Sequence, residues 1–328
     1  MTSRKLDIVA IGDAIVDVIA TCDDEFLLRH GLRKGSMQLL EPNAADRLYE
    51  AMGSARETSG GSAANTMAGV AAMGGRAAFI GQVADDQLGA IFSHDLRALG
   101  VDFETPPLAD GLPTGRCLIL VTPDAQRTMN TSPGASHELR AEALDEALIR
   151  SAAILMLEGY LFGPDLPREA MYRAVEIAHA AGNKVAFTLS ESVCIAGRKE
   201  GFQAMIDRGG VDLLFANEEE ALQLTGAADL DGAVAELQVR VPTLVLTRGP
   251  AGAVAVENGA RTDLPAVPVQ KVIDTTGAGD LFAAGFLAAR CKGHGIERQL
   301  MTGAIAAAEV IGHFGARPVA DLKDLAKL

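Results

Sequence analysis

Cysteine is sparse in this 328-residue sequence, and the four cysteines lie far apart, at Cys22, Cys117, Cys194 and Cys291. They form no CxxC pair and no Cys/His spacing of the kind that holds zinc. A chain of this length buries enough apolar surface to fold without covalent cross-links. We therefore expect reduced thiols, and we exclude a disulfide-stapled secreted domain and a cysteine metal site.

Positive charge is also scarce, with 29 lysine and arginine residues against 43 aspartate and glutamate residues and a formal net charge of −14. This excess of negative charge disfavours nucleic acids and anionic membranes as partners. No hydrophobic run is free of charges over the length of a membrane span, and residues 6–11 read as a strand without a preceding signal-peptide pattern. These features predict a cytoplasmic protein with no nucleic-acid partner and no membrane partner.

Several common nucleotide-binding motifs are missing. There is no GxxxxGK[ST] sequence, and there is no HRD or DFG signature of protein kinases. A dinucleotide-binding fingerprint in the glycine-rich segment near residue 280 would need glycine at the position of Phe282. The sequence therefore disfavours a P-loop enzyme, a protein kinase and a Rossmann cofactor site.

The sequence does contain a regular alternation of short apolar runs with longer helix-like stretches. This alternation is typical of βαβ units around a mostly parallel sheet. Most of the runs are apolar throughout, as expected for strands that helices cover on both faces. The strand candidates are residues 8–12, 77–81, 154–157, 185–189, 213–215, 244–247 and 253–256. The predicted fold is α/β, with a doubly wound, mostly parallel sheet.

Two stretches break this alternation, at residues 15–40 and 103–129. They contain β-like runs but no helix of the core type, so we expect them to pair into a small β-sheet lid over the carboxyl ends of the main strands. The alternative is that they are two ordinary surface excursions. The predicted large domain comprises residues 1–12, 48–102 and 133–328, and the predicted lid comprises residues 13–47 and 103–132.

Residues 274–287 pass from a polar, glycine-rich segment, DTTGAGD, into an apolar helix. Gly277 and Gly279 allow a ligand to approach the backbone closely, and the first N–H groups of the helix, around Ala278, have no partner within it. Together with the helix dipole, these donors suit the negative charge that develops on a phosphoryl group during transfer.

Asp280 lies at the start of the same helix, where a carboxylate beside a phosphate is electrostatically unfavourable unless it has a function. Taking a proton from an attacking hydroxyl is such a function. The alternative is a first-turn aspartate that complements the helix dipole, with the two glycines only shaping a turn.

A second polar cluster lies near the N-terminus, where two carboxylates follow the first strand and a Gly-Gly-Ser segment opens a helix of small residues. A strand-end carboxylate accepts two hydrogen bonds from a vicinal diol, and the Gly-Gly-Ser segment offers uncharged donors and acceptors. The cluster predicts a site for a neutral polyol, although a simple strand-to-helix turn with a serine N-cap is the alternative. Its members are Asp13, Asp17, Gly60, Gly61, Ser62 and Asn65.

Together, the GGSAAN segment at residues 60–65 and the DTTGAGD segment at 274–280 resemble the two signatures of the ribokinase family of carbohydrate and nucleoside kinases, also called the PfkB family. The resemblance spans nearly the whole chain. Between the signatures, Asn217 and Glu220 resemble the family's NxxE element, and residues 247–252 resemble its nucleotide-side turn. The resemblance implies nucleotide contacts from Asn217, Thr247, Gly249, Gly252 and Thr275.

The same resemblance implies a ribokinase-like α/β domain with a β-sheet lid and in-line phosphoryl transfer from ATP with Mg²⁺. Asp280 would act as the base, and the backbone amides of residues 277–279 would form the anion hole. Mg²⁺ would be held mainly by water and phosphates, with Asn217 and Glu220 reaching it through water. The resemblance leaves open K⁺ as a further cofactor, and either a monomer or a homodimer as the assembly.

Within this family the acceptor site is similar to that of adenosine kinases. Ser62 occupies a position at which ribokinases usually have lysine. Asp17 matches the carboxylate that binds the ribose diol, and Arg127 matches a lid arginine that faces the phosphate.

The nucleobase end of the site is also similar. Tyr160 and Phe162 follow a buried strand and resemble an apolar segment near the base, unless they are simply core residues. Gln38, among apolar neighbours, is a candidate lid contact.

The sequence therefore predicts an ATP-dependent kinase that transfers the γ-phosphate to the 5′-hydroxyl of a ribonucleoside, with adenosine as the expected acceptor. A sugar kinase of the same family, acting on ribose, fructose or a related sugar, is one alternative. A nucleoside-binding regulator without turnover is another, and the intact Asp280 argues against it.

Overall fold

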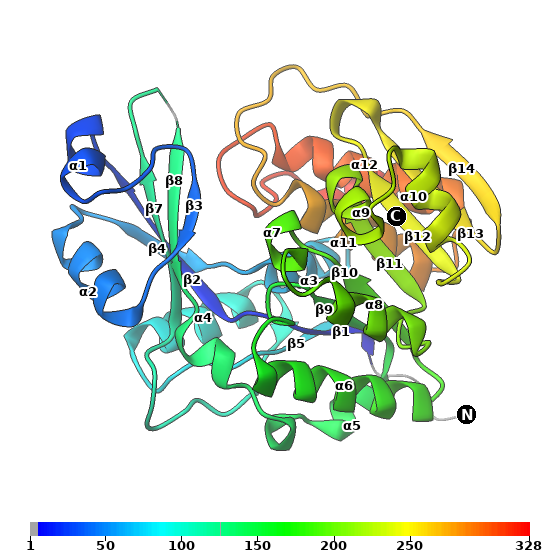
Figure 1. Ribbon diagram of the computed structural model, residues 1–328, viewed down its shortest axis with the longest axis horizontal. Coiled ribbons are helices and arrows are strands. Elements are labelled where there is room, and N and C mark those ends of the chain that lie inside the picture. Colours follow the sequence, from blue (N-terminus) through cyan, green and yellow to red (C-terminus); the bar gives the residue numbers. More distant parts are fainter. Residues whose placement is uncertain (1–5, 125) are drawn as a thin grey trace.

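The structure, a computed structural model, describes residues 6–124 and 126–328, so residues 1–5 of the predicted large domain lie outside this part. Its strands form two sheets (Figure 1). The strands of the larger sheet are β1 (Leu6–Ile11), β5 (Ala77–Ile80), β6 (Val101–Asp102), β9 (Ala152–Glu158), β10 (Lys184–Thr188), β11 (Leu213–Asn217), β12 (Thr243–Thr247), β13 (Ala253–Glu257) and β14 (Ala260–Leu264). Their order is β14-β13-β12-β11-β10-β9-β1-β5-β6.

Neighbouring strands of the larger sheet are parallel from β6 to β12, and β13 and β14 extend it antiparallel. Strand β1 lies between β5 and β9, so the chain winds outward from it in both directions. The predicted doubly wound, mostly parallel sheet is confirmed. Ligands of such sheets bind where the strand order reverses, which here is at the carboxyl ends of β1 and β9.

Helices cover both faces of this sheet. In chain order, the helices of the described residues are α1 (Asp24–Arg29), α2 (Pro42–Ala51), α3 (Ser62–Ala72), α4 (Gln87–Ala98), α5 (Glu146–Ser151), α6 (Asp165–Ala180), α7 (Ser192–Ile195), α8 (Lys199–Asp207), α9 (Glu218–Thr225), α10 (Leu230–Leu237), α11 (Ala278–Cys291), α12 (Ile296–Val310) and α13 (Leu322–Ala326), with 3₁₀ turns at Gly134–Glu138, Ala141–Ala143 and Gly249–Ala251. Of these, α1 and α2 lie against the smaller sheet rather than the larger one (Figure 1). In the described part of the chain, every helix is too short or too polar to cross a membrane.

The larger sheet and the helices that cover it pack together through two hydrophobic cores, one on each face of the sheet. One contains α3, α11 and α12, and the other contains α6, α8 and α9. Successive residues of β1 contribute to different cores, with Ile8 and Ala10 in the first and Val9 and Ile11 in the second. This alternation explains why the central strands are apolar throughout their length.

The smaller sheet contains both stretches that break the alternation in the sequence. Its strands are β2 (Ile15–Thr21), β3 (Met37–Leu39), β4 (Arg56–Ser59), β7 (Gly115–Val121) and β8 (Arg127–Ser132), in the order β3-β8-β7-β2-β4. Helices α1 and α2 flank it on the side of the molecule away from the nine-stranded sheet (Figure 1). We call this sheet, with α1 and α2, the lid.

One boundary of the predicted lid is wrong. Strand β4 belongs to the lid sheet, whereas we assigned residues 48–102 to the large domain. Its sequence, RETS, lacks an apolar run because it is an edge strand that pairs with β2 alone. The stretch 15–40 also contains helix α1, which begins where the Asp23 carboxylate accepts a hydrogen bond from the N–H of Phe26 at 2.7 Å.

Strand β8 shows why an apolar pattern is a poor guide in the lid. Its buried residues are Thr128, Asn130 and Ser132, all of them polar. The Asn130 amide donates to the carbonyl of Leu118 on β7 at 3.1 Å. A buried amide that is hydrogen-bonded in this way is tolerated, so polar side chains face the interior of the lid.

Two connections between the lid and the large domain lie against each other at the crevice. Residues 12–14 join β1 to β2, and Gly60 and Gly61 join β4 to α3. Gly61 has φ of 88°, and a Cβ at this position would lie 2.3 Å from the carbonyl oxygen of Asp13. A residue with a side chain fits neither the conformation nor the space, so the close contact between the two connections requires glycine.

We expect Phe162→Ala to lower the free energy of unfolding by about 3–5 kcal/mol, as for other buried phenylalanines. Phe162 is 1% exposed, and its ring lies 5.0 Å from that of Phe202 and 5.5 Å from that of Phe187. Urea unfolding followed by circular dichroism measures the change. Phe314→Ala, at a residue 60% exposed, is the matched control and should change stability by less than about 0.5 kcal/mol. Equal small losses in both variants would contradict the packing described here.

Candidate active site

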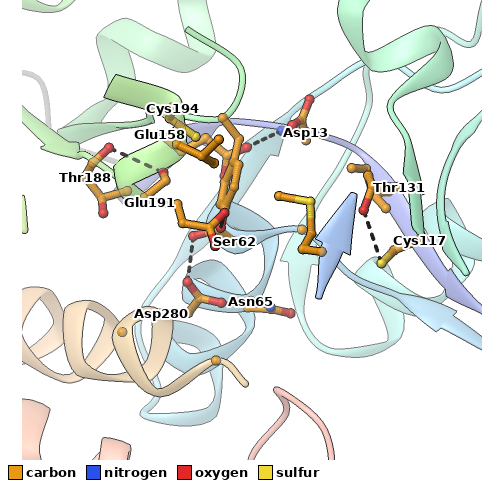
Figure 2. Close-up of a pocket in the computed structure, with 18 of the residues that line it drawn as sticks. Asp13, Ser62, Asn65, Cys117, Thr131, Glu158, Thr188, Glu191, Cys194 and Asp280 are labelled. Atoms are coloured by element: carbon orange, nitrogen blue, oxygen red, sulfur yellow. Dashed lines mark hydrogen bonds between the residues drawn. The ribbon is translucent and has the colours of Figure 1, made fainter. Parts of the chain in front are cut away.

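A cavity of about 700 Å³ lies between the lid and the carboxyl ends of the central strands. Strands β2, β3, β7 and β8 line one side, and the first residues of α3 and α11 line the other. Figure 2 shows Cys117 and Thr131 of the lid across the cavity from Ser62, Asn65 and Asp280. Small-molecule sites commonly have volumes of roughly 300–1,000 Å³, so the cavity is a candidate active site.

Asp280 lies in the first turn of α11, where two residues of α3 hold its carboxylate. The Ser62 hydroxyl donates to Asp280 Oδ1 at 2.6 Å, and the Asn65 amide donates to Asp280 Oδ2 at 2.9 Å (Figure 2). The two signature segments thus meet at one carboxylate. Asn65 Oδ1 is buried and, among the described residues, has no hydrogen-bond partner.

The protonation of Asp280 reflects opposing influences. Burial raises the pKa of its carboxyl group, whereas the hydrogen bonds from Ser62 and Asn65 and the positive charge of Arg317 lower it. The net shift is upward. A carboxylate with a raised pKa is a stronger base than an exposed aspartate, and this suits proton abstraction from a hydroxyl.

The DTTGAGD segment forms the N-terminal end of α11. Gly277 has φ of 77°, and a Cβ there would lie 2.6 Å from the Cβ of Ala316, so glycine is required. The N–H groups of Gly279 and Asp280 lie in the first turn, where a helix supplies no acceptor for them. Ala278 differs from the predicted set of anion donors, because its N–H donates to the carbonyl of Thr275 at 3.2 Å.

Arg127, at the start of β8, links the lid to this segment. Its guanidinium forms an ion pair with Asp274 and donates to the hydroxyl of Thr276 at 3.1 Å. The predicted lid arginine therefore lies beside the candidate anion site, where its partners are the side chains of Asp274 and Thr276. Arg127 Nε is buried and has no hydrogen-bond partner among the described residues.

Asp13 and Asp17 mark the acceptor end of the cavity. Asp13 follows β1, and its carboxylate accepts a hydrogen bond from the hydroxyl of Ser136 at 2.8 Å. Asp17 lies on β2, where a Cβ on Gly60 would be 2.6 Å from the Asp17 carboxyl carbon. Gly60 itself does not line the cavity, but its lack of a side chain leaves room for this carboxylate.

Burial shifts the protonation of these carboxyl groups as well. It raises the pKa of Asp17 to about 6, although the charges of Arg317 and Arg127 act in the opposite direction and that of Asp280 adds to the rise. The pKa of Asp13 is also raised by burial, against the lowering effects of His137 and Ser136.

Glu158 is a site residue that the motif analysis did not assign. It ends β9, is fully buried, and accepts hydrogen bonds from the backbone N–H groups of Asp13 and Ala63, both at 2.6 Å. Figure 2 shows Glu158 beside Asp13. With these two hydrogen bonds, Glu158 joins the connection between β1 and β2, which contains Asp13, to the first turn of α3. Its position at the end of an apolar strand was the available signal, because such a carboxylate lies at the ligand-binding edge of the sheet.

Tyr160 and Gln38 line the cavity as predicted contacts, whereas the prediction for Phe162 is wrong. Phe162 points into the core behind the cavity and packs on the rings of Phe187 and Phe202. Side chains two positions apart on an irregular segment need not face the same way. Of the two aromatic residues, Tyr160 lines the cavity and Phe162 does not. The Tyr160 hydroxyl lies 3.4 Å from a carboxylate oxygen of Glu191.

The NxxE pair forms a helix cap at the other end of the cavity. The side-chain oxygen of Asn217 accepts from the N–H of Glu220 at 2.8 Å, and its amide donates back to Glu220 at 2.7 Å. The Glu220 side chain also accepts from the N–H of Asn217 at 3.0 Å, so α9 begins with a capping box. Asn-x-x-Glu is itself a capping signature, and the sequence could have shown it.

The same pair is the predicted contact with Mg²⁺. Burial raises the pKa of Glu220 to about 7. Within the described part of the chain, no group of three or more His, Cys, Asp or Glu side chains could hold a metal ion. These residues do not form a protein cage for a metal ion, and contact with Mg²⁺ through water stays a prediction.

The other predicted nucleotide contacts divide into two groups. Thr247 and Thr275 line the cavity beside Asn217. Gly249 and Gly252 lie in the turn after β12. They are not among the described residues that line the cavity.

Comparison with known proteins tests the resemblance to the PfkB family independently. A profile of the pfkB family of carbohydrate kinases matches residues 5–322. A probable sugar kinase from Rhizobium etli CFN 42 has a TM-score of 0.92 and 41% identity, covering 99% of this chain and 98% of that chain. Adenosine kinase from Sinorhizobium meliloti has a TM-score of 0.91 and 45% identity, covering 98% and 99%.

A third similar protein is a kinase with different nucleosides in its name. Guanosine-inosine kinase of Escherichia coli strain K12 is 31% identical over 257 residues, which represent 75% of this chain. The chain spans 58% of that relative's length. Because the family profile spans nearly the whole chain, the resemblance inferred from the two signature segments is confirmed: this chain belongs to the pfkB family of carbohydrate kinases.

Proposed function

We propose that this protein is a kinase that transfers the γ-phosphate of ATP to a hydroxyl of a nucleoside or sugar, and that adenosine, phosphorylated to AMP, is its preferred acceptor. The observation that carries this proposal is the shared contact at Asp280. A carboxylate lies at an anion-binding helix start and is oriented by two residues of the acceptor segment. This is the arrangement that phosphoryl transfer to a hydroxyl requires.

The proposed chemistry follows from the positions of the groups. The acceptor hydroxyl would donate its proton to Asp280 as its oxygen bonds to the γ-phosphorus, and the bond to the β–γ bridging oxygen would break to release ADP. The N–H groups of Gly279 and Asp280 would stabilise the charge on the transferring group. Arg127 is close enough to supply positive charge from the lid side.

The nucleotide would lie at the end of the cavity formed by Asn217, Thr247 and Thr275. When bound, Mg²⁺ would neutralise charge on the phosphates. Asn217 and Glu220 would reach the ion only through water, because their polar atoms are already engaged in the helix cap and are not free to bind it directly.

Three features favour a nucleoside as acceptor. Ser62 is uncharged and lies beside the proposed catalytic base, Asp280. Asp17 lies on the lid, where a vicinal diol could donate hydrogen bonds to it. Tyr160 offers an aromatic face in the cavity on which a nucleobase could stack. The adenosine kinase and guanosine-inosine kinase relatives agree with this choice. The similarity to a probable sugar kinase makes a sugar acceptor the second candidate.

ADP formation with MgATP against adenosine, inosine, guanosine, cytidine, ribose and fructose tests the proposal. Adenosine should give the highest kcat/KM, by at least about tenfold, which corresponds to roughly 1.4 kcal/mol. A higher value for a sugar would move the acceptor from nucleoside to sugar and leave the chemistry intact. Turnover with none of the six acceptors would refute the proposed activity.

Asp280→Asn should lower kcat by at least about 100-fold, the low end for a positioned base, with little change in nucleoside affinity. The amide keeps the shape of the carboxylate but cannot take the proton. Initial-rate kinetics and isothermal titration calorimetry measure the two effects. Ser62→Ala, which removes one of the two hydrogen bonds to Asp280, is the control and should lose less. Unchanged turnover in Asp280→Asn would remove Asp280 from the mechanism.

Nucleoside affinity should weaken as the pH falls through about 6, the value to which burial raises the pKa of Asp17. Below this pH the carboxyl group is protonated and no longer accepts two hydrogen bonds from a diol. Calorimetric titrations at pH 7 and pH 5 should show a loss of about tenfold, because about nine-tenths of Asp17 is protonated at the lower pH.

Two variants identify the group responsible for this pH dependence. Asp17→Asn should bind weakly and equally at both pH values, whereas Asp280→Asn should keep the pH dependence. An unchanged pH dependence in Asp17→Asn would show that another group controls binding.

A further inference from the structure

Arg317 has no place in the chemistry proposed above, yet it contacts both ends of the acceptor segment. It lies in the loop between α12 and α13. Its guanidinium donates to the carbonyl of Ala64 at 2.8 Å and to the carbonyl and hydroxyl of Ser59 at 3.0 and 3.1 Å. Ser59 ends β4 of the lid and Ala64 lies in α3, so one side chain spans the Gly60–Ser62 turn between them.

A second charged residue holds the same point from the opposite side. Asp95 on α4 accepts a hydrogen bond from the N–H of Ser59 at 3.0 Å. Its negative charge also acts on Arg317. The peptide groups of Ser59 are therefore fixed by a cation at the carbonyl and by an anion at the N–H.

The charge of Arg317 also reaches the carboxylates of the cavity. It acts on both Asp17 and Asp280, and in each case it favours the ionised form. Asp280 exerts the opposite influence on Asp17 and on the buried Glu158. Ser62 and Asn65 donate hydrogen bonds to Asp280, and the hydroxyl of Tyr160 is a further titratable group within its electrostatic range. Arg317 thus counters a cluster of negative charges.

Arg317 does this without lining the main cavity. It borders a separate surface hollow of about 370 Å³, together with residues of α3 and the C-terminal loop. Burial among these elements lowers the pKa of its guanidinium to about 10, so it stays cationic at neutral pH. A direct contact with the acceptor is therefore not part of its role.

We propose that Arg317 is a positioning residue for phosphoryl transfer, which fixes the Gly60–Ser62 turn against α11 and brings positive charge to Asp280 without contacting the acceptor. This inference rests on the proposed kinase function. It predicts that removing the positive charge makes the base harder to ionise, whereas removing a purely structural contact would lower activity equally at all pH values.

The test compares kcat against pH in the wild-type protein, Arg317→Met and Arg317→Lys, using the best acceptor from the panel. In Arg317→Met the acidic limb should move to higher pH by at least about half a unit, so the loss of kcat is larger at pH 6 than at pH 8. Arg317→Lys, which keeps the charge, should restore the limb towards the wild-type position. An equal loss at every pH in Arg317→Met would overturn the proposal.

Arg298→Met is the matched control. Arg298 also donates to backbone carbonyls, those of Ala326 and Lys327, but at the C-terminal end of the chain. Its pH profile should coincide with that of the wild type. Arg317→Gln keeps hydrogen-bond donors without the charge and replaces Arg317→Met if that variant does not fold.

A second readout needs no turnover. The carboxyl carbon of Asp280 can be followed by NMR in protein labelled with ¹³C at the aspartate carboxyl groups, with Asp280→Asn providing the assignment. Its titration midpoint should rise in Arg317→Met or Arg317→Gln and stay near the wild-type value in Arg298→Met. An unchanged midpoint would overturn the proposal even if the kinase is active. A raised midpoint in a protein that phosphorylates no acceptor would support the role of Arg317 while refuting the proposed function.

Discussion

The pair of hydrogen bonds that Asp280 accepts from Ser62 and Asn65 is the interaction around which the candidate site is organised. These residues lie 218 and 215 positions from Asp280 in the sequence, and only the doubly wound sheet brings α3 and α11 together. The same contact brings the start of α3, the Asp280 carboxylate and the N-terminal end of α11 into one corner of the cavity. In the proposed mechanism, the fold contributes mainly by positioning these groups, as phosphoryl transfer requires.

Several buried carboxyl groups lie close together in this corner of the cavity. Asp13, Asp17, Glu158 and Asp280 share one cavity, and burial raises the pKa of each. Unpaired charges in such a place are unfavourable, and backbone N–H groups, hydroxyls and Arg317 offset part of the cost. A cluster of carboxyl groups with raised pKa values is characteristic of functional sites. It is consistent with the proposed acceptor, an uncharged molecule with several hydroxyl groups.

The large sheet and the two signature segments were predictable because their patterns are local: apolar strands, and glycines at helix starts. The lid was harder. Strand β8 buries Thr128 and Asn130, and β4 is a polar edge strand, so neither shows the apolar run that marks a strand. Phe162 and Tyr160 lie two residues apart but face the core and the cavity respectively, a difference that sequence spacing does not determine. Arg317 carries no motif, and its contacts with Ser59 and Ala64 exist only in the folded chain.

The most direct test of this account is a crystal structure of the protein with adenosine and a non-hydrolysable ATP analogue. The account predicts that the 5′-hydroxyl oxygen lies within hydrogen-bonding distance of Asp280, about 2.6–3.2 Å. It also predicts the γ-phosphate at the N-terminal end of α11 and the ribose diol at Asp17. A hydroxyl bound instead to Asp13 or Glu158, with Asp280 contacting only Ser62 and Asn65, would contradict it.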